Sequence, residues 1–282
     1  KEFFGGDVKT GLQNLPVNMV EKINAYDRQS DNARITGIDD GEEETVLDLT
    51  VKKGMNQGWV GNMDGGLGTE NRYSASANVN RFASHGENST QFSLIGRANN
   101  VGDRRFGGGG GPQWRRNNGL NASKELGLNY AMEREKVEFG ASARYNYRDN
   151  DVQSLGQVEN FLLGGANSSF MNSNSANRNK NQNFFGHLRL EWRPDSMTTF
   201  FMRGNLSWGK SESGSESLSA TFNSDPYAVV ADPNKFLDFD SETNEELDKI
   251  RVNASNNGSM SEGNSLSANG NMQLTRKLNS EG

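Results

Sequence analysis

The sequence has no cysteine and only two histidines among its 282 residues. The absence of cysteine excludes disulfides and thiolate metal sites; it is also only a weak indication of an oxidising compartment, because many cytosolic chains lack cysteine. His85 and His187 are far apart in the chain, which gives a metal site or a nucleophilic triad little support. Neither Gly-x-Ser-x-Gly nor His-Glu-x-x-His occurs. We therefore predict no enzyme, no metal site and no cofactor.

Long hydrophobic runs are also missing. Apolar residues make up 32% of the chain and the formal net charge is -6. No run of about 18 apolar residues occurs, so a transmembrane helix is excluded. Such averages are typical of soluble acidic or disordered proteins. They remain compatible with a membrane-spanning β-barrel, because a strand around a watery interior needs apolar residues on one face only.

The most informative stretch is 184–209, where apolar and polar residues alternate with a period of two. The apolar positions are Phe184, Gly186, Leu188, Leu190 and Trp192, then Phe200, Met202, Gly204, Leu206 and Trp208. A turn at 194–197 separates the two halves, which predicts a β-hairpin. Aromatic residues stand at both ends of each apolar face with smaller residues between them, as in a strand that crosses a bilayer.

The same alternation predicts eight antiparallel strands after residue 54. They lie near 58–67, 72–83, 90–99, 119–132, 136–148, 183–193, 198–209 and 264–276. Long loops are expected near 100–118, 149–182 and 210–263, and the connections between them are short. Outer-membrane barrels combine short periplasmic turns with long extracellular loops. We therefore expect a mainly β protein in which residues 55–282 form part of an antiparallel transmembrane β-barrel.

Charged residues gather on the opposite face of these strands. A register shift by one residue would turn Arg144, Arg189 and Arg203 to lipid, at about 2 to 4 kcal/mol each near the midplane. This face is therefore assigned to the barrel lumen. The candidate lumen-lining residues are Arg97, Glu138, Arg144, His187, Arg189, Glu191 and Arg203. Charge pairing across strands, or with a domain inside the barrel, is the simpler interpretation of the same residues. Lys124 and Arg81 are exceptions, because both point outward and must reach toward headgroups.

The first long loop contains a basic, aromatic segment. Five glycines at 107–111 are flanked by the candidate ligand-contact residues Arg104, Arg105, Trp114, Arg115 and Arg116. No Gly-Lys-Ser/Thr follows, so a phosphate loop has no support, and a flexible loop is the simpler interpretation.

Residues 1–54 predict a small mixed domain, with a helix over 7–15, strands over 19–26 and 45–52, and a polar turn region over 27–44. The acidic run at 39–44 predicts a solvated turn rather than a metal site. Inside a barrel, its carboxylates Asp39, Asp40, Glu42, Glu43 and Glu44 are expected near inward arginines such as Arg144, Arg189 and Arg203.

Two segments of this domain carry a family resemblance. VEKINAYD at 20–27 and TVLDLTVKKG at 45–54 resemble the last strands of the plug domain of TonB-dependent outer-membrane receptors. The opening KEFFGGD and GIDDGE at 37–42 resemble the variant found in large outer-membrane β-barrel proteins with a carboxypeptidase-like N-terminal domain. The resemblance implies that residues 1–54 are the C-terminal part of a plug domain and that 55–282 begin a larger barrel, so that the chain is an internal fragment.

The resemblance also implies a function. It is that of a Gram-negative outer-membrane receptor for TonB-dependent uptake of a chelate, glycan or peptide. The implied partners are outer-membrane lipid, a TonB-type energy-transducing complex acting through a segment before residue 1, the ligand and a surface lipoprotein, but not nucleic acid. Two alternatives stay open: a non-transporting outer-membrane β-barrel with a binding or structural role, and a soluble secreted adhesin.

Overall fold

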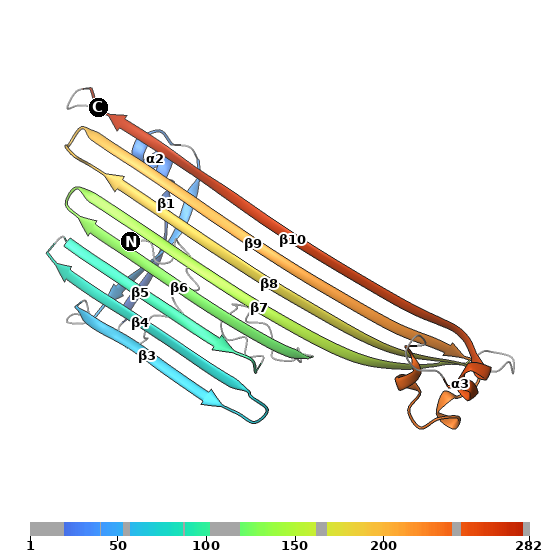
Figure 1. Cartoon of the computed structure of the whole chain (residues 1–282). Coiled ribbons are helices and arrows are strands. Elements are labelled where there is room, and N and C mark those ends of the chain that lie inside the picture. The colour runs from blue at the N-terminus through green and yellow to red at the C-terminus, as the bar shows by residue number, and fades with distance from the viewer. Residues whose placement is uncertain are drawn as a thin grey trace.

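The computed structural model describes residues 20–39, 41–52, 57–86, 88–101, 119–161, 168–238 and 244–278. These residues are mainly β (Figure 1). A small N-terminal unit consists of β1 (Val20–Gln29), α2 (Asp31–Thr36) and β2 (Glu43–Val51). The large sheet consists of β3 (Gly58–Leu67), β4 (Tyr73–His85), β5 (Asn88–Asn99), β6 (Leu120–Arg134), β7 (Val137–Asn160), β8 (Ser169–Trp192), β9 (Thr198–Phe222) and β10 (Arg251–Arg276).

The large sheet is an antiparallel meander in which each strand pairs with its neighbours in sequence. The predicted eight strands and their antiparallel order are thereby confirmed. The sheet is open, with β3 and β10 as its edges (Figure 1). Closure would require strands that pair with both edges.

The connections at one end of the sheet are tight, as expected. The β3–β4 connection at the other end is also tight: Glu70 and Asn71 have φ of 56° and 57°, and the Arg72 N–H donates to the Thr69 carbonyl at 3.2 Å. This is a turn of type I′, whose twist matches that of a hairpin. At β4–β5, Gly86 takes φ of 57°, which glycine adopts without strain.

Strands β7 to β10 extend further than the alternation predicted. Residues 149–160, 169–182, 210–222 and 251–263 belong to these strands, so the loops expected at 149–182 and 210–263 are in large part strand. The physical reason is that both faces of the extensions are rich in serine and asparagine. Pairing of backbone N–H and C=O groups needs no apolar alternation, so the sequence pattern ends before the sheet does.

The segment between β9 and β10 packs against the far end of the sheet. It contains the short helices η3 (Pro226–Ala228), η4 (Pro233–Phe236) and α3 (Glu245–Ile250), which lie at the tip of the long strands (Figure 1). Leu237 and Leu247 are buried there against Ala220 and Phe222 of β9. This small hydrophobic core makes the segment an ordered cap over its described residues.

In the N-terminal unit β1 pairs with β2, and α2 belongs to the segment that connects these two strands. Both strands were predicted, whereas α2 falls in the region predicted to be a polar turn. Ser30 caps its start by accepting from the Ala33 N–H at 3.0 Å, and Gly37 ends it with φ of 72°. Six residues are too few for a helical period to show, so only these caps indicate the helix. The helix expected over 7–15 lies outside the described residues.

The large sheet exposes apolar side chains on one face and buries polar side chains on the other, which is the reverse of the pattern in a water-soluble protein. The face that carries Leu188 and Leu206 is here called the outer face, and the one that carries Arg189 and Arg203 the inner face. Exposed apolar side chains on the outer face include Trp59, Met63, Leu67, Leu126, Leu128, Tyr130, Trp192, Leu206, Leu266, Met272 and Leu274. Buried polar side chains on the inner face include Asn78, Asn80, Ser89, Ser93, Asn99, Asn129 and Glu191. Soluble proteins bury the first kind and expose the second.

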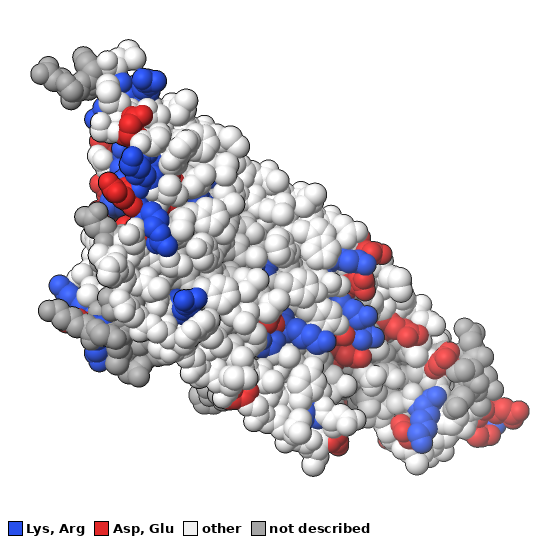
Figure 2. Space-filling view, turned by 60° about the vertical axis from the view of Figure 1, so that its left-hand side comes forward, with Lys and Arg blue, Asp and Glu red and all other residues white. Residues whose placement is uncertain are grey.

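A band almost free of charge crosses the molecule (Figure 2). On β7 to β10 the outer face carries no charged residue between the level of Trp192 and Phe200 and the level of Trp208 and Leu266. Lysine, arginine, aspartate and glutamate gather on either side of the band (Figure 2). The apolar surface is therefore a belt of limited height.

Candidate functional site on the inner face

The seven candidate lumen-lining residues share the inner face, as the register of the strands shows. Glu138 lies opposite Glu191 and Arg189 opposite Arg203, Arg144 and His187 occupy further alternate positions on β7 and β8, and Arg97 lies on β5. The structure brings five of the seven into one polar cluster: Glu138, His187, Arg189, Glu191 and Arg203. Arg97 is separate and pairs with Glu125 on the next strand at 3.8 Å. Arg144 lines a neighbouring pocket.

Glu191 is the centre of the cluster. Its side chain is 1% exposed and accepts from three arginines. The Arg34 guanidinium of α2 approaches both carboxylate oxygens, at 3.2 and 2.6 Å. Arg189 donates at 3.1 Å and the Nε of Arg193 at 2.9 Å. A buried carboxylate is tolerated only when its lone pairs are occupied in this way, so Glu191 joins α2 to the sheet.

Asp31 makes the second connection between α2 and the sheet. Its carboxylate lies 3.5 Å from Arg189 and 3.6 Å from Arg203. These arginines face each other on adjacent strands, an arrangement of like charges that is unfavourable unless an anion lies between them. Burial raises the pKa of Asp31, but the charge and hydrogen bond of Arg189, helped by Arg28 and Arg34, outweigh it and hold the pKa below its ordinary value.

Among the described side chains, Asp31 is an acidic partner of Arg189 and Arg203, and the expected contact of the acidic run at 39–44 with inward arginines stays a prediction. Asp39 instead accepts from the Gly41 N–H within its own turn at 3.0 Å. Asp40 and the side chain of Glu44 lie outside the described residues. Two further contributors were missed: Arg193, which directly follows β8 and continues its parity, and Phe201, whose ring centroid lies 5.4 Å from the Arg189 guanidinium carbon. Strand parity was sufficient to identify both, whereas Asp31 and Arg34 required knowledge of α2.

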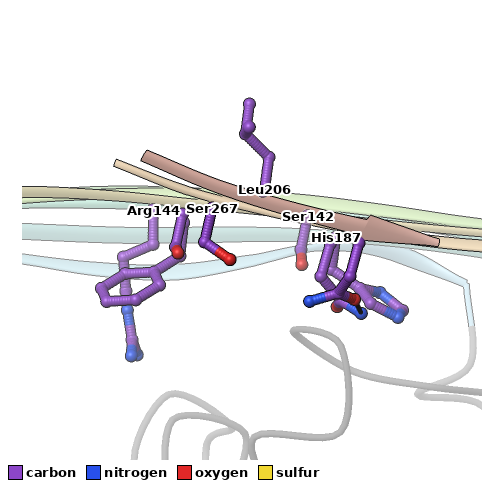
Figure 3. A pocket seen from close by; sticks show the side chains of 10 residues that line it. Ser142, Arg144, His187, Leu206 and Ser267 are labelled. Carbon is purple, nitrogen blue, oxygen red and sulfur yellow. Dashed lines mark hydrogen bonds between the residues drawn. The ribbon is translucent and has the colours of Figure 1, made fainter. Parts of the chain in front are cut away.

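A pocket of about 220 Å³ adjoins the cluster on the inner face. Ser142, Arg144, His187 and Ser267 point into it, while the Leu206 side chain lies on the opposite side of the sheet (Figure 3). His187 links pocket and cluster, because its Nε2 accepts from the Nε of Arg203 at 3.4 Å.

The two outward cations are stabilised by aromatic rings. The Lys124 ammonium lies 5.7 Å from the ring centroid of Tyr147, and the Arg81 guanidinium lies 5.4 Å from that of Trp59. Each pair joins adjacent strands. A cation above an aromatic ring gains favourable electrostatic energy, so each ring stabilises the outward charge beside it.

The outer-loop candidates Arg104, Arg105, Trp114, Arg115 and Arg116 lie outside the described residues. Among the residues that are described, no group of three or more His, Asp or Glu is arranged to hold a metal ion. Within the same ranges, no helix is long and apolar enough to cross a membrane. No family model, curated protein or solved structure matches the chain.

Proposed function

We propose that the large sheet is part of the wall of a β-barrel in a Gram-negative outer membrane. The observation that supports this most strongly is the inversion of its faces, with apolar side chains exposed on one side and polar side chains buried on the other. Phe200 and Trp208, which bound the apolar belt on β9, are eight residues apart. This separation is roughly 26 Å along the strand. On a strand with the usual tilt it fits within an apolar band about 25 Å tall.

The open edges of the sheet are consistent with a larger barrel. An unpaired edge in hydrocarbon leaves backbone groups without partners, so β3 and β10 require further strands beside them. Eight strands enclose little more than their own side chains, whereas barrels of about 22 strands hold an internal plug. In this proposal the N-terminal unit is the end of such a plug, held against the wall through Asp31 and Arg34.

We propose further that the barrel is a receptor for TonB-dependent uptake. The resemblance of residues 20–27 and 45–54 to plug strands supports this, and so does the way α2 is attached. Its described contacts with the sheet are ion pairs. A plug that is pulled aside by an energised partner during transport requires a polar, reversible contact of this kind.

Membrane insertion is tested by labelling in intact cells that express the full-length protein. A cysteine at Ser224, in the cap, should react with a membrane-impermeant maleimide from outside. One at Asp195, in the β8–β9 turn, should react only after the cells are opened. Recovery of the protein in the soluble fraction, or labelling of Asp195 but not Ser224 in intact cells, would contradict the proposed insertion or its direction.

Transport is tested by deleting the plug segment from the full-length receptor. The barrel should still assemble, growth on the imported nutrient should stop, and the cells should become sensitive to large antibiotics. If deletion changes neither growth nor permeability, transport is refuted and a non-transporting outer-membrane protein remains.

A further inference from the structure

Three exposed arginines lie on the outer face where the apolar belt meets the end of the sheet with the tight turns. These turn-side arginines are Arg81, Arg134 and Arg276. Arg134 lies in the row across the sheet that contains Trp192, and Arg276 occupies the next outward position after Leu274. Side chains at this margin of a membrane-spanning sheet are at the level of the lipid headgroups.

Two of these arginines contact neutral groups in the described part of the chain. The Arg81 guanidinium carbon lies 5.4 Å from the ring centroid of Trp59. Arg134 donates to the Ser89 carbonyl at 3.0 Å and to the Thr90 hydroxyl at 3.1 Å. A ring, a carbonyl and a hydroxyl orient a guanidinium but carry no formal charge, so the positive charge of both arginines is not neutralised by these contacts.

The third arginine lies near an acid that is used elsewhere. Arg276 acts electrostatically on Asp195, in the β8–β9 turn. The Asp195 carboxylate accepts from the N–H groups of Met197 and Thr198, both at 2.8 Å, and so caps its own turn. Arg276 is exposed, which leaves its N–H donors accessible to an anion from outside the chain.

Cations at the opposite margin of the belt are paired with carboxylates. Arg178 lies 2.8 Å from Asp149, and the Lys210 ammonium lies 2.7 Å from Glu212 and 3.0 Å from Glu262. All five side chains are on the outer face, above the level of Trp208 and Leu266 in the strand extensions. The two margins therefore differ: these charges balance on the extension side, whereas the turn side presents exposed arginines.

We propose that the turn-side arginines bind the phosphate groups of anionic glycerophospholipids. A guanidinium binds a phosphate through two parallel hydrogen bonds, and its apolar stem can lie along the belt while its head reaches the phosphate. A lipid with net negative charge gains attraction from each such arginine, but gains little where cations already have carboxylate partners. The inference rests on the proposed function, because it names the lipid that the membrane-embedded belt holds at one of its margins.

The experiment is native mass spectrometry of the full-length protein in detergent, titrated with phosphatidylglycerol or with phosphatidylcholine of the same acyl chains. Wild type should bind the first phosphatidylglycerol about 5-fold more tightly, the factor expected for one arginine beside an anionic headgroup. A combined variant with Arg81→Gln, Arg134→Gln and Arg276→Gln should lose this preference. The same three positions changed to lysine should keep it, because the charges remain. Arg178→Gln with Lys210→Gln is the matched control and should behave like wild type.

Equal affinity of wild type for the two lipids, or an unchanged preference in the triple glutamine variant, would overturn the inference. Loss of the preference in the control variant would do the same, because it would place the anionic lipid at the opposite margin. So would its loss in the triple lysine variant, because charge would then not be the cause. Heat-modified electrophoretic migration shows whether each variant is folded.

The same experiments separate this inference from the proposed function. If the protein inserts as proposed but binds both lipids equally, the inference fails and the proposed function stands. If the protein prefers phosphatidylglycerol but is recovered from cells in the soluble fraction, the proposed function fails instead.

Discussion

Replacing Glu191 by glutamine should release α2 from the sheet. Glutamine retains the shape of the side chain and one acceptor oxygen, but it removes the charge that Arg34, Arg189 and Arg193 share. The effect on the sheet itself should be smaller, because Glu138 also contacts Arg189 at 3.4 Å and Arg193 at 3.3 Å. Among the described residues, the other acidic contact of Arg34 is with Asp31 of its own helix.

The expected magnitude follows from burial. Breaking a buried ion pair by removing one partner costs about 3 to 5 kcal/mol. The Arg34 side chain is 36% exposed, so solvent recovers part of this and the cost falls to or below the lower end of that range. A loss of about 2 to 3 kcal/mol corresponds to a 30- to 150-fold larger population of undocked α2.

Hydrogen exchange measures this population directly. The Arg34 and Gly37 N–H groups donate to the Ser30 and Ala33 carbonyls at 3.0 and 2.9 Å, so their exchange reports on the integrity of α2. Exchange of both should accelerate in Glu191→Gln. Asp149→Asn breaks a pair with Arg178 on the strand extension and should leave them unchanged. If the two variants behave alike, or if Arg34→Gln and Glu191→Gln add without coupling in a double-mutant cycle, the docking argument is wrong.

Three further predictions concern the belt and the pH response. Leu188→Arg should impair barrel assembly, because an arginine on the lipid face costs about 2 to 4 kcal/mol. Asn205→Arg, one strand away on the inner face, should assemble normally, and heat-modified electrophoretic migration distinguishes the two outcomes. In lipid vesicles, the guanidinium chloride concentration at which half of the protein is unfolded should be unchanged or higher in Lys124→Met, because an apolar side chain replaces an outward cation. A clear fall in this concentration would refute the outer-face assignment. The lowered pKa of Asp31 means that its stabilising effect is complete above its ordinary value of 3.8 and is lost as pH falls through the lower folded value. Hydrogen exchange at the Arg34 and Gly37 N–H groups, corrected for the intrinsic pH dependence of exchange, should therefore stay slow at pH 5 and accelerate in stronger acid, and protection that is independent of pH would contradict this assignment.

The strands could be predicted where lipid and lumen impose different chemistry on alternate residues. Between Phe184 and Trp208 one face is apolar and the other polar, and both the hairpin and its faces follow from that contrast. Just beyond Trp208 both faces are polar, so nothing in the sequence distinguishes strand from loop over 210–217, although backbone pairing continues to Phe222. The cap was missed for a different reason, because its core consists of a few residues from distant positions in the sequence, such as Phe222 and Leu247.

The candidate site was predictable in part, and the reason lies in how each charge is positioned. Strand parity alone places Arg189, Glu191 and Arg203 on one face, and the cost of turning arginine to lipid selects that face. Parity cannot say which charges meet across the gap between the sheet and the N-terminal unit, because that depends on where a six-residue helix lies. Arg189 and Arg203 stand opposite each other, so an anion had to be found between them. The sequence offers an acidic run at 39–44 and an isolated Asp31, and it is Asp31, in the first turn of the Ser30-capped helix, that supplies the charge.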